Sequence, residues 1–336
     1  MTSALVVRSP AGRLSVGAQP APEGITHEMS ADRELDAAGI TGQLLREAYR
    51  RCRALNAEHG RTYFLATRML SPEQRPAVHA LYGFARWVDD IVDDVHGDPV
   101  RKAERLAAVE VALASALDRR TTSDPVLTAL LDTARRYDIP DVHFRDFMAS
   151  MRMDLTVTDY ATRAELLRYV HGSAAVIGLQ VLPVLGTVVP AEEAEPAAAA
   201  LGIAFQLTNF IRDVGEDLDR GRVYLPADEL AEFDVDRDRL VWARAAGRAD
   251  DRVRAALRDQ VGHARRAYAQ ARPGIAMLAP RSRPCVATAY RLYGRILDLV
   301  EEAGCDVLSR RVAVSNGRRL AVALPAFARA VLARTA

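Results

Sequence analysis

Uninterrupted helical periodicity is the feature that most limits what this chain folds into. From Leu44 onward apolar residues recur with the spacing of a helix face, and alternating runs of β-branched residues are scarce. Alanine is abundant, whereas aromatic residues make up only 6% of the 336 residues. This composition favours helices over strands. We therefore predict an all-α protein.

The chain reads as one helical domain behind a short tail. Residues 1–35 are rich in Pro, Gly, Ala and Ser without sustained periodicity, which predicts a flexible N-terminal tail. No linker divides residues 36–336. Helix starts are indicated by Ser71-Pro72-Glu73-Gln74, by Asp124-Pro125 and by Thr162 with Glu165. Earlier helices should end near Val95, Tyr137 and Arg152, and later ones should span about 163–186, 192–218, 248–272, 283–302 and 317–333.

Charge and motif content exclude several classes of protein. With 45 basic and 44 acidic residues, the chain lacks the basic footprint of a nucleic-acid binder. It has neither a P-loop nor a glycine fingerprint, so no nucleotide cofactor is expected. Three scattered cysteines and the lack of a signal-peptide pattern favour a cytoplasmic protein. The most apolar segment, Ala174 to Val189, contains Gln180 and Pro183 and predicts a buried helix rather than a membrane span.

The segment from Leu81 to Asp94 carries four aspartates, which helical phase separates into two sets. A core stripe contains Leu81, Phe84, Val88, Ile91, Val92 and Val95. One line beside that stripe contains Tyr82, Arg86, Asp89 and Asp93. Asp90 and Asp94 point further round, toward solvent. We therefore expect Asp89 and Asp93 to be the functional pair.

A second segment, Gly202 to Asp217, is mostly apolar around its circumference. One narrow polar line interrupts it, formed by Gly202, Gln206, Asn209, Asp213 and Asp217. A polar line on an otherwise apolar helix predicts that the line faces an internal cavity.

Both segments place carboxylates four residues apart, where like charges repel by roughly 0.2–0.5 kcal/mol even on an exposed helix. In a cavity the repulsion grows, and one carboxylate takes up a proton unless a cation compensates. Oxygen ligands without nearby His or Cys favour a hard ion, Mg²⁺ or its substitute Mn²⁺, bound around a diphosphate. A single acidic pair is more often a solvated surface. Two pairs, each aligned with Arg, Tyr, Gln or Asn, favour the metal site.

These residues resemble the two signature motifs of the squalene and phytoene synthase family. The first segment resembles the family's aspartate-rich motif. The run 206–217, continued by Arg220-Gly221-Arg222-Val223-Tyr224-Leu225-Pro226, resembles its second motif. The likeness extends from about Tyr49 to Arg319, and within the family the residues of both motifs are most similar to those of bacterial phytoene synthases. The resemblance implies a single-domain isoprenoid-synthase-type helical bundle around a central cavity, and dependence on Mg²⁺.

Carried over by motif position, the resemblance assigns roles to individual residues. The implied metal ligands are Asp89, Asp93, Asn209, Asp213 and Asp217. The residues implied to bind substrate are Tyr63, on a flexible covering segment, Arg86, Gln206, Arg212, Tyr224, Tyr293 and Arg311. Tyr82 and Tyr169 would lie near the reacting groups. Arg310 is an alternative register for Arg311, and without the resemblance core packing is the preferred interpretation of Tyr169 and Tyr293.

The implied reaction joins two molecules of geranylgeranyl diphosphate head to head through prephytoene diphosphate to phytoene, a step of carotenoid biosynthesis. Squalene, dehydrosqualene and hydroxysqualene synthases of the same family use farnesyl diphosphate instead, and the sequence leaves this choice open. Enzymes of head-to-tail prenyl elongation and terpene cyclisation also bind metal ions through aspartate-rich helices, but their motifs match residues 213–217 poorly. A non-catalytic helical lipid-binding or assembly protein is the alternative from another class. Peripheral membrane contact would suit greasy substrates, although no basic amphipathic anchor stands out.

Overall fold

The computed structural model describes residues 23–59, 64, 66–94 and 97–308, and it confirms the all-α prediction. Within these ranges the only β-type pairings are two isolated bridges, Asp159 with Val223 and Thr187 with Leu278. The helices, with one short π-helix named η1, are α1 (Glu23–Ala37), α2 (Gln43–His59), α4 (Arg75–Val92), α5 (Pro99–Arg119), α6 (Pro125–Arg136), α7 (Asp141–Met153), α8 (Arg163–Val170), η1 (His171–Ala175), α9 (Val176–Leu185), α10 (Ala191–Asp219), α11 (Ala227–Ala231), α12 (Arg237–Ala245), α13 (Asp251–Ala271), α14 (Gly274–Met277) and α15 (Arg283–Glu302).

Local capping chemistry explains where several helices begin. The side chain of Asp124 accepts a hydrogen bond from the Leu127 amide, and Thr162 accepts one from the Glu165 amide, as the sequence predicts. The start predicted at Ser71 is displaced, because α4 begins only at Arg75. Ser71 Oγ instead donates to Gln74 Oε1 at 2.9 Å, which closes a turn ahead of the helix.

Two predicted boundaries near the N-terminal half require correction. Helix α1 begins at Glu23 and buries Ala31 and Leu35, so the helical part starts inside the segment predicted as a tail. Residues 1–22 lie outside the described part of the chain. Helix α4 ends at Val92, before the predicted end near Val95, and Asp93 is its C-cap.

The later helices follow the prediction closely, with one difference. The helices predicted at about 192–218, 248–272 and 283–302 correspond to α10, α13 and α15. The one predicted at 163–186 is interrupted by the π-turn η1. The helix predicted at 317–333 lies outside the described residues. No helix in the described ranges is long and apolar enough to cross a membrane.

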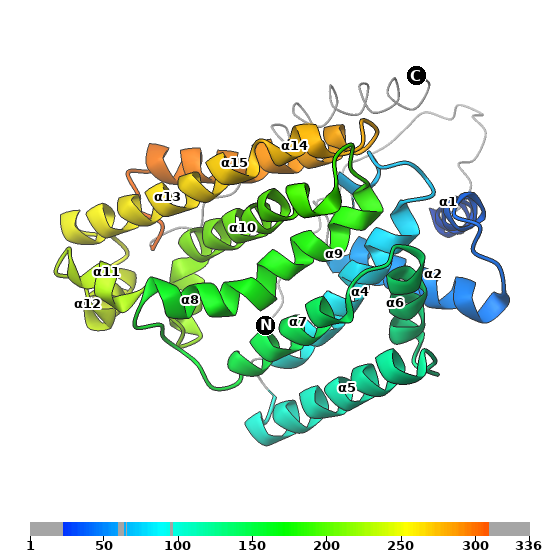
Figure 1. Ribbon diagram of the computed structural model, residues 1–336. Coiled ribbons are helices and arrows are strands. Elements are labelled where there is room, and N and C mark those ends of the chain that lie inside the picture. The colour runs from blue at the N-terminus through cyan, green and yellow to red at the C-terminus, as the bar shows by residue number, and fades with distance from the viewer. Residues whose placement is uncertain (1–22, 60–63, 65, 95–96, 309–336) are drawn as a thin grey trace, which may run out of the picture.

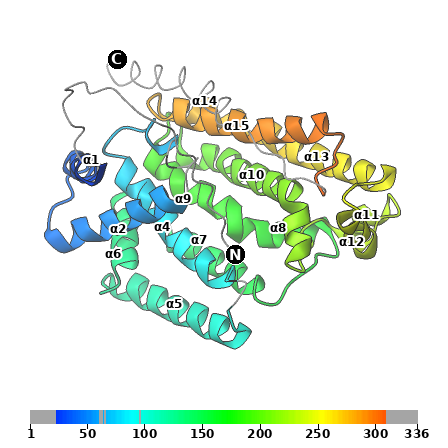
Figure 2. The ribbon, with the colours of Figure 1, turned by 180° about the vertical axis from the view of Figure 1, so that it is seen from behind.

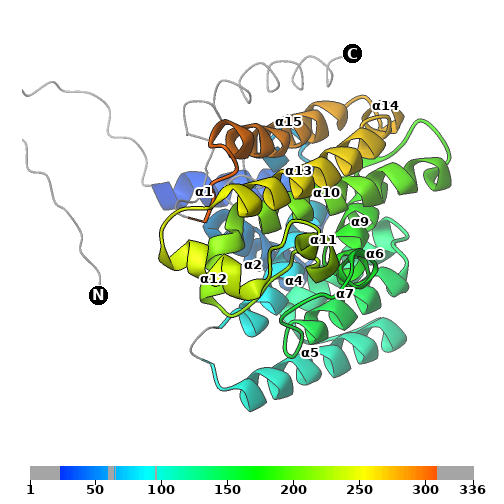
Figure 3. The ribbon, with the colours of Figure 1, turned by 90° about the vertical axis from the view of Figure 1, so that its left-hand side faces the viewer.

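Helix α10 occupies the middle of the bundle (Figure 1). It packs against α13 and α15 on one side and against α9 and η1 on the other. Helix α4 packs against α2, α6, α7 and α9 in the other half of the molecule, seen from behind in Figure 2. The end-on view in Figure 3 shows α13 and α15 on one outer face and α5 on the opposite one.

The apolar interior is divided into separate clusters of buried side chains, and this division positions the site. One cluster gathers around α10 and α13 and includes Phe210 and Tyr224. Another gathers around α2, α4, α6 and α7 and includes Val92 and Met151. The aspartates predicted to be functional lie on α4 and α10, one helix from each half. Their meeting place is therefore the seam between the two halves.

A buried ion cluster ties α1 to α2 and α4. The Glu34 side chain is almost fully buried and accepts hydrogen bonds from Arg53 Nε at 3.2 Å and from Arg75 Nη1 at 3.0 Å. Burial alone would raise the pKa of Glu34, but His79, Arg53 and Arg75 outweigh it and bring that pKa down to about 2.

We expect Glu34→Gln to lower the free energy of unfolding by about 2–4 kcal/mol at pH 7, because two partly buried arginines lose their charged partner. The pKa of Glu34 is depressed on folding, so its stabilisation is complete above about pH 4.5 and is lost as the pH falls toward about 2. Urea melts of parent and variant should thus converge over that range. The exposed Glu47, paired with Arg50, provides the control: Glu47→Gln should cost less than about 1 kcal/mol. A difference in the free energy of unfolding between the parent and Glu34→Gln that does not change with pH would contradict the assignment.

Candidate active site

An acidic cavity of about 210 Å³ lies at the seam between the two halves, and all four predicted aspartates line it. Asp89 and Asp93 come from the end of α4, and Asp213 and Asp217 come from the last turns of α10. Apolar side chains of both interior clusters complete the wall, among them Val92, Met151 and Phe210. The structure therefore brings together residues more than a hundred positions apart in the sequence.

Helical phase separates the aspartates of α4 as predicted. Asp89 lines the cavity, whereas Asp90 turns away and forms an ion pair with Arg86. Burial, with a further contribution from Asp93, raises the pKa of Asp89 to about 7. The Asp93 side chain is more exposed than its helical position beside Asp89 predicts, because α4 ends at this residue. Its Oδ1 lies 3.6 Å from Arg222 Nη1.

The polar line of α10 faces the cavity along its length. Gln206, Asn209, Asp213 and Asp217 are all lining residues. Burial, followed by the charge of Asp213, raises the pKa of Asp217 to about 7. Asp213 accepts a hydrogen bond from Arg212 Nε at 2.7 Å and a second, shorter one from Arg212 Nη2. The cavity thus contains more negative charge than its surroundings neutralise.

A second, apolar cavity of about 330 Å³ adjoins the acidic one. Asp89, Ser173, Gln206 and Asn209 line both cavities, so these four residues mark the junction. Away from the junction, small and aliphatic side chains form the wall. They include Leu81, Ile177, Leu182, Ala194, Ala198 and Leu278, and Tyr82 also lines this cavity. The protein thus has a charged cavity and an apolar cavity side by side, with four lining residues in common.

Asp154 and Arg222 are lining residues to which the sequence assigned no role. Asp154 Oδ2 accepts a hydrogen bond from Tyr169 Oη at 2.9 Å, and Oδ1 accepts one from Tyr224 Oη at 3.2 Å. Burial raises the pKa of Asp154 to about 6, although Arg222 opposes the rise. Arg222 donates to the Asp154 carbonyl at 2.8 Å and faces Asp93. The only sequence signal for Asp154 was one carboxylate in an apolar stretch, Phe147 to Leu155.

Tyr169 and Tyr224 form an aromatic wall beside the acidic cavity, whereas Tyr82 lines the apolar cavity. Tyr224 stacks on Phe210 with 4.2 Å between ring centroids, and Tyr169 stacks on Tyr224 at 5.6 Å. The isolated bridge between Asp159 and Val223 brings the chain around Tyr224 against the loop after α7. Tyr169 and Tyr224 therefore line the cavity with their hydroxyls directed at Asp154, rather than packing only as core.

Some predicted binding residues do not line either cavity in the described structure. The guanidinium of Arg86 pairs with Asp90, that of Arg212 pairs with Asp213, and the ring of Tyr293 stacks on Phe205 with 4.4 Å between centroids. The Arg86–Asp90 pair has the i,i+4 spacing that helical phase allows, whereas the contact between Tyr293 on α15 and Phe205 on α10 depends on tertiary packing. Tyr63 and Arg311 fall outside the described residues.

The residues of the acidic cavity fit hard divalent cations such as Mg²⁺. The donor set consists of carboxylate and amide oxygens, which Mg²⁺ prefers. The carboxyls with raised pKa values at Asp89 and Asp217 show that negative charge there lacks compensation. The buried Oδ1 of Asn209 has no hydrogen-bond partner among the described residues, and an unpartnered amide oxygen is a suitable cation ligand.

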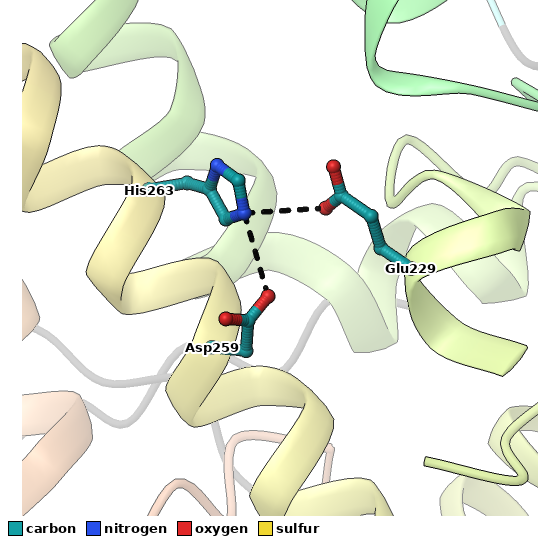
Figure 4. A group of neighbouring side chains, drawn as sticks. All are labelled: Glu229, Asp259 and His263. Carbon is teal, nitrogen blue, oxygen red and sulfur yellow. Dashed lines mark ion pairs between the residues drawn. The ribbon is translucent and has the colours of Figure 1, made fainter. Parts of the chain in front are cut away.

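A second cluster of candidate metal ligands, Glu229, Asp259 and His263, lies on α11 and α13 (Figure 4). His263 Nε2 lies 3.6 Å from Glu229 Oε2 and 3.4 Å from Asp259 Oδ2. However, Arg163 already pairs with both oxygens of Glu229, and Gln260 donates to Oε2 at 2.7 Å. With Glu229 already paired, only Asp259 and His263 would remain to hold a cation, so we interpret the cluster as a structural ion pair.

The fold and the paired aspartate helices define a helical prenyltransferase, and comparison with known proteins identifies its family. The family described as squalene/phytoene synthase matches residues 56–318. The chain belongs to this family.

Among relatives, the chain is 36% identical over 294 residues to phytoene synthase 2, chloroplastic, of Solanum lycopersicum, covering 86% of this chain and 93% of the relative. It is 36% identical over 285 residues to the phytoene synthase of Arthrospira platensis, covering 82% and 90%.

Solved structures share the fold. A dehydrosqualene synthase in complex with ligand superposes with a TM-score of 0.76 at 24% identity, covering 84% of this chain and 96% of that one. A squalene synthase of Alicyclobacillus acidocaldarius superposes with a TM-score of 0.71 at 27% identity, covering 80% and 98%. The isoprenoid-synthase-type bundle predicted from the sequence is confirmed.

We expect Asp89→Asn to stabilise the protein in a chelating buffer at pH 8 by about 1–3 kcal/mol. The pKa of Asp89 is raised on folding, so the stability of the parent declines as the pH rises from about 4 through 7. The asparagine side chain of the variant does not ionise, so the variant should not show this decline. Added Mg²⁺ should raise the melting temperature of the parent more than that of the variant. Thermal melts with EDTA or MgCl₂ measure both effects.

Asp90→Asn is the matched control, because Asp90 is the next residue but pairs with Arg86 outside the cavity. It should leave the Mg²⁺ response intact. An equal loss of that response in both variants would show that the cavity does not bind the ion through Asp89.

Proposed function

We propose that the protein is a phytoene synthase that joins two molecules of geranylgeranyl diphosphate head to head and releases diphosphate. The observation that carries this proposal is that the two cavities meet at shared lining residues, among them Asp89, Gln206 and Asn209. One cavity suits a diphosphate with cations, and the other suits a long hydrocarbon chain. The 36% identity to phytoene synthases of plants and of Arthrospira platensis supports the choice of substrate.

In this proposal the oxygen atoms that hold Mg²⁺ are those of Asp89, Asp93, Asn209, Asp213 and Asp217. When bound, the ions would neutralise the charge of the departing diphosphate as Lewis acids. The raised pKa values of Asp89 and Asp217 support this role, because these carboxyls need positive charge nearby to stay ionised at neutral pH.

The remaining side chains would position substrate and exclude water. Arg220 and Arg222 line the acidic cavity and offer forked donors to diphosphate oxygens. Tyr169 and Tyr224 hold Asp154 in place through their hydroxyls. The apolar cavity would keep the allylic cation away from water, and the ring of Tyr82 on its wall would stabilise positive charge.

Both stages of the proposed reaction end in loss of a proton and need an acceptor, and the residues at the junction of the cavities limit the candidates. In the proposed course an allylic cation is attacked by the double bond of the second molecule, and proton loss closes the cyclopropane of prephytoene diphosphate. A second ionisation, rearrangement and proton loss give phytoene. The side chains at the junction are Asp89, Ser173, Gln206 and Asn209. None of them is a free base once Asp89 binds a cation, so we propose released diphosphate as the acceptor.

The length of the apolar cavity supports a long chain. On α10 the lining residues run from Asn209 back to Ala194, which is about 22 Å along the axis at 1.5 Å per residue. Farnesyl diphosphate is the alternative substrate, as in the dehydrosqualene and squalene synthases that share the fold. Incubation with C15 and C20 diphosphates in Mg²⁺, followed by identification of the hydrocarbon, separates the two. Release of diphosphate from neither would reject prenyl transfer altogether.

We expect Asp213→Ala to reduce turnover to background while the far-ultraviolet circular dichroism stays close to that of the parent. Asp213 is on a cavity wall and not in the apolar core, so its loss removes a ligand rather than packing. Release of inorganic diphosphate measures turnover. Loss of helicity in the variant, or turnover within a few fold of the parent, would contradict the assigned role.

We further expect Ala198→Phe to shift chain-length preference toward C15. A phenylalanine there would fill the tail end of the apolar cavity, so kcat/KM for the C20 diphosphate should fall by about tenfold or more and that for the C15 diphosphate much less. Ala199, the next residue, does not line the cavity, and Ala199→Phe is the control. Equal losses on both substrates would indicate distortion of the fold instead of a length limit.

A further inference from the structure

Ser173 lies at the junction of the two cavities, although neither sequence motif contains it. It lines the acidic cavity together with Asp89 and Asn209, and it also lines the apolar cavity beside Ile177 and Gly202. Because it touches both, its side chain lies where a charged head group would meet a hydrocarbon chain.

The π-turn η1, which contains Ser173, is held rigidly between α7 and α10. A Cβ at Gly172 would lie 2.2 Å from the Asp146 carbonyl oxygen on α7, so only glycine allows this approach. On the other side, a Cβ at Gly202 of α10 would lie 2.2 Å from the Ala174 carbonyl oxygen. Two backbone-to-backbone contacts therefore determine where Ser173 lies.

A side chain of α7 donates a hydrogen bond to a backbone carbonyl group just before the π-turn. Ser150 Oγ donates to the Tyr169 carbonyl oxygen at 2.8 Å. A π-turn adds a residue to the helix and is found mostly at functional positions. The turn here changes the direction of the helix face between Tyr169, on the acidic cavity, and Ile177, on the apolar one.

The hydroxyl of Ser173 is buried and has no hydrogen-bond partner among the described residues. Buried hydroxyls are nearly always paired, and an unpaired one is costly, so such a group calls for an explanation. Asn209 Oδ1, on α10 at the same junction, is likewise without a hydrogen-bond partner among the described residues. Two unsatisfied polar atoms at one place indicate that a polar ligand belongs between them.

We propose that Ser173 is a catalytic residue whose hydroxyl donates a hydrogen bond to the ester oxygen joining the prenyl chain to its diphosphate. This inference rests on the proposed function and adds a contact at the reacting bond. The ester oxygen is the one substrate atom that lies between head group and chain, as Ser173 lies between the two cavities. The unpartnered atom of Asn209 is its acceptor oxygen Oδ1, which suits a cation and not an anionic oxygen.

The contact acts when the bond between C1 of the allylic chain and the ester oxygen breaks heterolytically. Both electrons of that bond remain on the oxygen, which leaves as part of inorganic diphosphate, and C1 becomes the end of an allylic cation. The Ser173 proton stays on Oγ throughout. Negative charge grows on the oxygen during this step, so the hydrogen bond strengthens in the transition state and should act mainly on kcat.

The test compares Ser173→Ala and Ser173→Thr in the full chain, with geranylgeranyl and farnesyl diphosphates, Mg²⁺, and release of inorganic diphosphate as the readout. We expect Ser173→Ala to lower kcat by about tenfold or more with little change in KM. Ser173→Thr, which keeps the hydroxyl, should stay within about threefold of the parent. The melting temperature of Ser173→Ala should not fall, because the hydroxyl has no partner to lose in the free protein.

Thr208→Val provides the matched loss of a buried hydroxyl. Thr208 precedes Asn209 on α10 but lines neither cavity, and its Oγ1 bonds the Ala204 carbonyl oxygen at 2.7 Å. This variant should lose stability and keep its kcat.

Parental kcat in Ser173→Ala, or equal losses in Ser173→Ala and Thr208→Val, would overturn the inference while leaving the proposed function intact. A drop in both kcat and melting temperature for Ser173→Ala would assign Ser173 a structural role and would also overturn it. A parent that releases diphosphate from neither substrate would overturn the proposed function, and the role of Ser173 with it.

Discussion

Uncompensated negative charge at the seam of the bundle is the constraint on which the rest of the structure depends. Asp89 and Asp217 are withdrawn from water beside a second carboxylate each, and their pKa values rise to about 7. Such an arrangement destabilises the empty fold, because ionised carboxyls are costly to bury together. The large apolar clusters on either side offset that cost. The protein therefore holds a destabilising acidic cavity at this seam, which is the site that we propose binds cations and a diphosphate.

The small residues of η1, α9 and α10 allow this site to open into an apolar cavity. Gly172 and Gly202 let backbones approach more closely than any side chain would permit, and Gly178 does the same against the Ala198 carbonyl oxygen. The close approach positions the junction residues on rigid helices instead of loops, which suits a site that must hold a reacting bond in place. The short turn η1 therefore lies where the acidic cavity adjoins the apolar one, and its Ser173 lines both.

Much of the fold and half of the site follow from local chemistry that sequence reasoning can read. Caps at Asp124 and Thr162 begin helices as predicted, and helical phase correctly separates Asp89 from Asp90. The prediction of a tail as far as residue 35 was wrong, because α1 already begins at Glu23. Pro and Gly residues between positions 10 and 24 obscure the helix start in the sequence. The interruption by η1 was also missed, since a π-turn has no distinct periodicity.

By itself, the sequence determined the all-helical class, the polar lines on two helices and the chemistry that carboxylates four residues apart require. These properties depend on the intrinsic period of a helix, which is local. Only the tertiary structure decided that Asp154, Arg222 and Ser173 join the same site. Such choices depend on which helices meet and how closely, and that is settled by packing between segments distant in the chain.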